Sequence, residues 1–160
     1  MALPQARLTS RYDDGYAVSA AYQCGYDSVP FQLPCSEQTS ETVGRWLAVH
    51  AAPGSIVVVR HARWHLYEYH LDEIAKVNAR LGRVYLKQHG GFNFEGRGIS
   101  GPKGSLTLME PTATLLAVAM QGRTWQHGKP AFKRPLSARE IDLSRQLRER
   151  DTTREKARDR

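Results

Sequence analysis

Apolar and polar positions divide the middle of the chain into predicted strands. Residues 55–70 contain no proline or glycine and are rich in β-branched and aromatic side chains, which is typical of a strand. From Arg60 onward the residue types alternate, so the two faces of this strand should differ. Residues 83–88 predict a second strand, which Gly90 and Gly91 end.

The segment that joins these strands, residues 71–82, fits two structures. Its composition would support a helix with Gly82 as the C-terminal cap. It would equally support a strand over 73–77 and a tight turn over 78–82. We favour the strand and turn, because the whole stretch then continues one hydrophobic strand into a hairpin.

A first helix is predicted over residues 41–51, with Thr39 or Ser40 as its N-terminal cap and Pro53 and Gly54 after its end. The spacing of its larger side chains follows the period of a helix. One face of this helix is formed by Val43, Trp46, Leu47 and His50.

Two further helices are predicted from their end signals. Pro111 can open a helix that runs to Gln121 and is closed by Gly122. Ser137 and Glu140 have the spacing of a capping box, which begins a C-terminal helix.

These elements indicate one domain with two appendages. Residues 1–14 are expected to be a flexible leader, and residues 15–136 a single globular α+β domain whose first strand is 16–23. Residues 137–160 form the expected charged helix. Its apolar residues end at Leu147, so only its first turns should pack on the domain.

Positive charge is concentrated in one part of the chain. The formal net charge is +7, and residues 96–139 hold seven basic residues against the single acid Glu110. This window is rich in glycine and proline and ends in a predicted basic connector, residues 123–136. A charge confined in this way suggests a surface that binds an anion such as a phosphate backbone.

Trp125 and Phe132 lie among these cations, and two interpretations stay open. The rings could stack on bases beside a basic surface, as in proteins that bind single strands. They could instead anchor the connector to the core, because a tryptophan contributes a large apolar area. On the first interpretation, the predicted nucleic-acid-binding residues are Arg97, Lys103, Arg123, Trp125, Lys129, Lys133 and Arg134.

Histidines invite a metal hypothesis, which the strand prediction argues against. On one continuous strand, His61 and His65 would share a face while His70 would point to the other face. Such a strand would spoil a site with three ligands, so no metal site is predicted.

Motifs for catalysis or cofactors are weak. Residues 96–101 match the glycine pattern of dinucleotide-binding loops, but a strand and not a helix is predicted to follow. Cys24 and Cys35 lack a recognisable nucleophile motif, and the adjacent Asp72 and Glu73 should point apart. No catalytic residue and no cofactor is therefore predicted.

Residues 54–88 carry a resemblance to a known fold. Ile-x-Lys-Val-Asn at 74–78 and Gly-Arg-Val-Tyr-Leu at 82–86 resemble small SH3-like or KOW-like barrels of phage and mobile-element accessory proteins. The resemblance implies a domain that binds nucleic acid or peptides. The expected fold is α+β: a small bent antiparallel sheet or SH3-like partial barrel, one or two packed helices and a protruding C-terminal helix.

The expected function is that of a non-enzymatic nucleic-acid-associated accessory or regulatory protein. The alternative is a protein-binding module or inhibitor, such as an anti-defence protein, that acts through residues 137–160 and a sheet edge. No apolar run is long enough to span a membrane, and residues 1–14 lack the apolar core of a signal peptide. A cytoplasmic location with reduced cysteines is expected.

Overall fold

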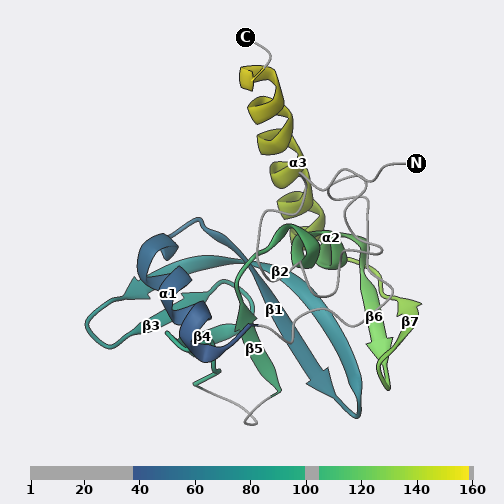
Figure 1. Ribbon diagram of the computed structural model, residues 1–160, viewed down its shortest axis with the longest axis horizontal. Coiled ribbons are helices and arrows are strands. Elements are labelled where there is room, and N and C mark those ends of the chain that lie inside the picture. Colours follow the sequence, from purple (N-terminus) through teal and green to yellow (C-terminus); the bar gives the residue numbers. More distant parts are fainter. Residues whose placement is uncertain (1–37, 100–104, 159–160) are drawn as a thin grey trace.

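The computed structural model describes residues 38–99 and 105–158, which form an α+β fold with a curled antiparallel sheet (Figure 1). The predicted leader, the predicted strand 16–23, both cysteines and Lys103 lie outside the described residues. The elements are α1 (Ser40–His50), β1 (Ile56–Arg63), β2 (Leu66–Asn78), β3 (Arg83–Leu86), β4 (Gly90–Asn93), β5 (Leu106–Met109), α2 (Ala113–Gln121), β6 (Arg123–Gln126), β7 (Lys129–Lys133) and α3 (Ala138–Arg158).

The sheet is a half-barrel built around the β1–β2 hairpin. Its strand order is β4-β3-β2-β1-β5, and β6 pairs with the beginning of β2 and with β7. The predicted α+β partial barrel with packed helices is confirmed. Figure 1 also shows the predicted C-terminal helix, α3, which extends away from the sheet.

Each face of the sheet packs on helices. On one face, Val58 and Leu71 pack with α2 and with Leu143 at the start of α3. On the other face, Val57 and Val59 pack with α1. Alternate residues of β1 therefore enter opposite cores, which explains why four successive positions, 56–59, are all buried.

The single strand predicted over residues 55–70 is wrong. The chain reverses at Trp64 and His65, which connect β1 to β2 and both have positive φ angles, 49° and 61°. Positive φ at both central residues is the geometry of a two-residue type I′ turn, for which Asn-Gly is the usual sequence. Trp-His carries no such signal, so the reversal was not predicted.

The favoured hairpin over residues 71–82 is confirmed. β2 runs through this region to Asn78, and β3 then pairs with it in the antiparallel sense. The turn ends at Gly82, whose φ of 62° suits glycine.

The helix ends largely follow the capping signals. Thr39 caps α1 with a reciprocal capping box, and Gly122 ends α2 in the left-handed conformation. Pro111 does not lie in the first turn of α2, because the N-terminal cap is Thr112. The Thr112 hydroxyl accepts a hydrogen bond from the Leu115 amide. Ser137 and Glu140 form the predicted capping box.

The basic connector predicted over residues 123–136 is also wrong, because it contains the β6–β7 hairpin. Pro130 is compatible with β7 since that strand pairs only with β6 among the described elements. Among the described residues, no helix is long and apolar enough to cross a membrane.

Candidate functional site

The β1–β2 hairpin brings two of the three neighbouring histidines onto one face. Val59 pairs with His70, and His61 pairs with Glu68, so His61, Glu68 and His70 share a face. The expectation that His70 points away from His61 is wrong, because it assumed one continuous strand. One potential ligand atom from each of the three side chains lies within 4.8 Å of the others.

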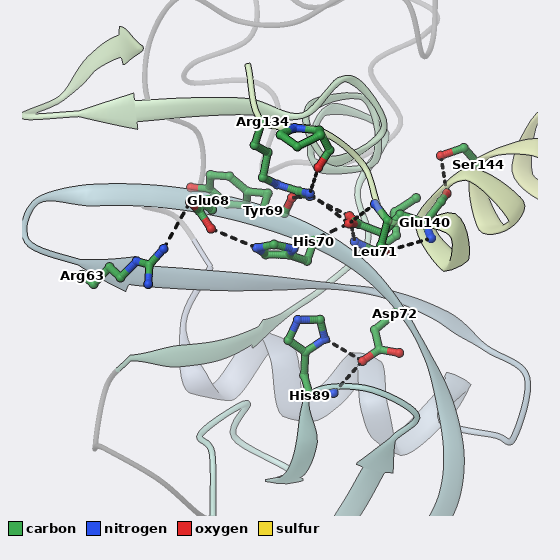
Figure 2. Close-up of polar contacts among 12 residues, drawn as sticks. Arg63, Glu68, Tyr69, His70, Leu71, Asp72, His89, Arg134, Glu140 and Ser144 are labelled. Carbon is green, nitrogen blue, oxygen red and sulfur yellow. Dashed lines mark hydrogen bonds and ion pairs between the residues drawn. The ribbon is translucent and has the colours of Figure 1, made fainter. Parts of the chain in front are cut away.

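Carboxylates hold the histidine rings on this face. His70 Nε2 lies 3.2 Å from Glu68 Oε2, and its Nδ1 lies 3.8 Å from Glu140 Oε1. His89 Nδ1 lies 2.7 Å from the buried Asp72 carboxylate. Figure 2 shows Glu68 and His70 pointing toward one another and His89 beside Asp72.

A buried ion pair fills an interruption in the sheet. Between the part of β2 that pairs with β6 and the part that pairs with β3, this strand edge has no β-strand partner among the described elements. Arg134 donates to the Tyr69 carbonyl at 2.6 Å, and Glu140 accepts from the Leu71 amide at 3.3 Å. Arg134 and Glu140 also bind each other through two hydrogen bonds, so together they satisfy a sheet edge that would otherwise be open.

The pKa shifts follow from these contacts. Burial alone would raise the pKa of Glu140, but its interactions with His70 and Arg134 outweigh burial and hold that pKa well below the usual range. Burial first, and the neighbouring Arg63 charge second, lower the pKa of His61. The Glu140 carboxylate is therefore charged and the His61 ring neutral at neutral pH.

A second polar region lies where two hairpin turns meet. The β6–β7 turn also has positive φ at both central residues, 51° at His127 and 77° at Gly128. The His127 amide donates to the His65 carbonyl at 3.0 Å, and the two imidazole rings stack with centroids 5.0 Å apart. We call Arg63–His65 and the β6–β7 hairpin the paired tips; Figure 1 shows the two turns side by side.

The paired tips expose large aromatic side chains. Trp64 is 90% exposed and Phe132 is 56% exposed. A tryptophan in the left-handed conformation is strained and here contributes almost nothing to a core. Backbone strain of this kind is often found at functional sites.

Cations lie along the β6–β7 hairpin, the hairpin that carries Phe132. Lys129 and Lys133 are exposed, and Lys133 lies directly opposite Arg123 in the β6–β7 register. Like charges in this relation repel, and within the described part of the chain none of the three forms an ion pair. The paired tips therefore carry uncompensated positive charge.

Two of the predicted nucleic-acid-binding residues, Trp125 and Arg134, have buried side chains that support the fold instead. Trp125 is 0% exposed and meets Tyr69 edge to face, so the stacking interpretation of Trp125 is wrong and the core interpretation is confirmed. The prediction that Arg134 binds phosphate is wrong, because its side chain is only 8% exposed and is bound to Glu140. Both errors arise because burial depends on the tertiary packing of the hairpin.

The remaining predicted cations do not all gather in one place. Arg97 pairs with Thr107 beside β5 and lies 3.7 Å from Glu95, away from the paired tips. Arg123, Lys129 and Lys133 share the β6–β7 hairpin. Trp64 was not among the predicted nucleic-acid-binding residues. Its only signal in the sequence is its position as an apolar residue between Arg63 and His65.

Comparisons with family models, curated proteins and solved structures found no match to this chain.

Proposed function

We propose that the protein is a non-enzymatic accessory factor that binds single-stranded nucleic acid through the paired tips. The observation that carries this proposal is Trp64, which is 90% exposed at the end of the β1–β2 hairpin. A second ring, Phe132, is exposed on β7, the neighbouring hairpin. Bases of any sequence can stack on such rings, so the binding would be weakly sequence-specific.

Charge supports the same proposal. Arg123 and Lys133 oppose each other across β6 and β7 without a carboxylate partner among the described residues, and Lys129 lies next to the turn. A phosphate backbone would relieve this repulsion as it binds. The cations would provide most of the affinity, and the rings would position the bases.

Replacing Trp64 with asparagine is expected to separate binding from folding. Asparagine tolerates the left-handed conformation better than tryptophan, so the free energy of unfolding should rise by about 0.5–1 kcal/mol. Binding should weaken by about 1–3 kcal/mol, because a stacking platform is lost. Denaturant unfolding and fluorescence anisotropy with a labelled homopolymeric single strand would measure the two effects.

Val49 provides a control for this variant, because it is 76% exposed on α1. Val49→Ala should leave the anisotropy titration unchanged. Unaltered binding by a folded Trp64→Asn variant would rule out stacking on this ring.

Salt dependence is expected to report the number of phosphate contacts. Three contacts, from Arg123, Lys129 and Lys133, should give a log–log slope of about −2 for a single strand. Lys129→Ala should reduce the magnitude of this slope by about 0.7. A series of anisotropy titrations at increasing salt measures both values.

The matched control removes a cation from another part of the surface. Arg45 on α1 has a side chain that is 62% exposed, and Arg45→Ala should preserve the slope. If the wild type shows no salt dependence, or if Arg45→Ala and Lys129→Ala behave alike, the paired tips are not the phosphate-binding surface. The alternative function, protein binding through residues 137–160, stays a prediction.

A further inference from the structure

The face of the β1–β2 hairpin that carries His61, Glu68 and His70 has the composition of a metal site. Two imidazoles and one carboxylate suit zinc and similar divalent transition metals. The three residues come from adjacent strands, where cross-strand pairing fixes their backbone positions. This rigid support reduces the rearrangement that binding would require.

The distances suit coordination. A tetrahedral zinc ion with ligands at about 2.0–2.1 Å places neighbouring ligand atoms about 3.3 Å apart. Glu68 Oε2 and His70 Nε2 are already separated by 3.2 Å, and the cluster including His61 spans at most 4.8 Å. Small side-chain rotations would therefore bring the three atoms around one ion.

An independent observation is the carboxylate behind the His70 ring. Histidines that bind metals usually direct their other ring nitrogen to a carboxylate or a carbonyl, which orients the ring. His70 has Glu140 beside its Nδ1 and directs Nε2 to the cluster. His89, whose ring centroid is 5.3 Å from that of His70, has Asp72 at its Nδ1.

The cluster of His61, Glu68 and His70 is partly shielded from solvent but still accessible to an ion. The side chains of Glu68 and His70 are 11% and 18% exposed. Arg63 lies 3.8 Å from Glu68 Oε1, whereas Oε2 is hydrogen-bonded to His70 Nε2, and a bound ion would replace that hydrogen bond. The Arg63 side chain is 58% exposed and has room to move aside.

We propose that His61, Glu68 and His70 bind one divalent transition-metal ion of the zinc class. Three protein ligands would leave a coordination position for water or for an anionic ligand. None of the three ligands belongs to the paired tips, although Arg63 contacts Glu68. The Zn²⁺ titration therefore tests this site without relying on the proposed nucleic-acid function.

The experiment is a titration of the full chain, prepared without a histidine tag and stripped with a chelator, with Zn²⁺ by calorimetry and with Co²⁺ by visible absorption. The wild type should bind one ion per chain. His61→Gln and Glu68→Gln should each weaken binding at least about 100-fold, since removal of a ligand should exceed the effect of losing an outer-shell partner.

Control variants test binding by two histidines outside the cluster, His50 and His127. His50 lies on α1, and His127 forms the stacked pair with His65, so His50→Gln and His127→Gln should keep the wild-type affinity. Failure of the wild type to bind, wild-type affinity in either ligand variant, or loss of binding in His127→Gln would overturn the proposal.

A second measurement covers the case in which a ligand variant does not fold. Imidazole signals of the wild type, followed by nuclear magnetic resonance during the Zn²⁺ titration, should shift for His61 and His70 and not for His50. Shifts confined to His65 and His127 would overturn the proposed site.

Discussion

Replacing Trp125 with alanine is expected to lower the free energy of unfolding by about 3–5 kcal/mol. The indole is completely buried, pairs with Tyr67 across β2 and β6, and meets Tyr69 edge to face at a centroid distance of 5.9 Å. Its removal leaves a large cavity where the β6–β7 hairpin joins the core. The loss is a large fraction of the stability of an ordinary domain, about 5–15 kcal/mol.

Denaturant unfolding would measure the effect as a lower midpoint. Trp64→Asn is the matched control, because it removes the same residue type from a position that is 90% exposed. A Trp125→Ala variant as stable as the wild type would show that this hairpin does not pack on the core as described.

Replacing Glu140 with alanine is expected to destabilise the fold by about 3–5 kcal/mol. Arg134 would keep its charge in a position where its side chain is 8% exposed, and the Leu71 amide would lose its acceptor. Glu149→Ala is the control on the same helix, because its pair with Arg145 is exposed to solvent and should contribute little to stability. Denaturant unfolding compares the two variants.

The double variant Arg134→Met/Glu140→Leu distinguishes two roles for this pair. An ion pair replaced by apolar residues is often nearly neutral for stability. If the pair also satisfies the β2 edge, the Tyr69 carbonyl and the Leu71 amide lose their partners, and at least about 2 kcal/mol should remain lost. A double variant with wild-type stability would contradict the edge-satisfying role.

Acid should reduce the contribution of Glu140. Its pKa in the folded protein is lowered, so this contribution is present above the usual glutamate pKa of about 4.3 and is lost as the pH falls through the folded-state pKa. The stability difference between the wild type and Glu140→Gln should therefore narrow below about pH 4. Unfolding curves of both proteins across this pH range would show whether their stability difference narrows or widens as the pH falls.

Local signals account for what the sequence predicted correctly. The caps at Thr39, Gly122 and Ser137 were predictable because a cap depends on residues three or four positions away. The hairpin after residue 73 was predictable because a run of strand residues met a turn that ends in glycine. These short-range features were sufficient for the α+β class and for most helix boundaries.

The candidate sites needed longer-range information. His61 and His70 share a face only because the chain reverses at Trp64 and His65, whose residue types do not favour that turn. A chain reversal changes the strand partners of every residue beyond it. Because the turn at Trp64 and His65 was not predicted, the cluster of His61, Glu68 and His70 could not be predicted either. The exposure of Trp64 and the burial of Trp125 depend on the same geometry.

The distribution of charge also depends partly on the sequence alone and partly on the tertiary structure. The amino-acid sequence by itself determined that positive charge is concentrated in residues 96–139, since this requires only counting. Tertiary structure alone decided which charges stay available: Arg139 pairs with Glu73, Arg134 enters a buried pair, and Lys129 and Lys133 stay exposed. The physical reason is that the strength of an ionic interaction depends on distance and burial, and folding sets both between residues that are far apart in the chain.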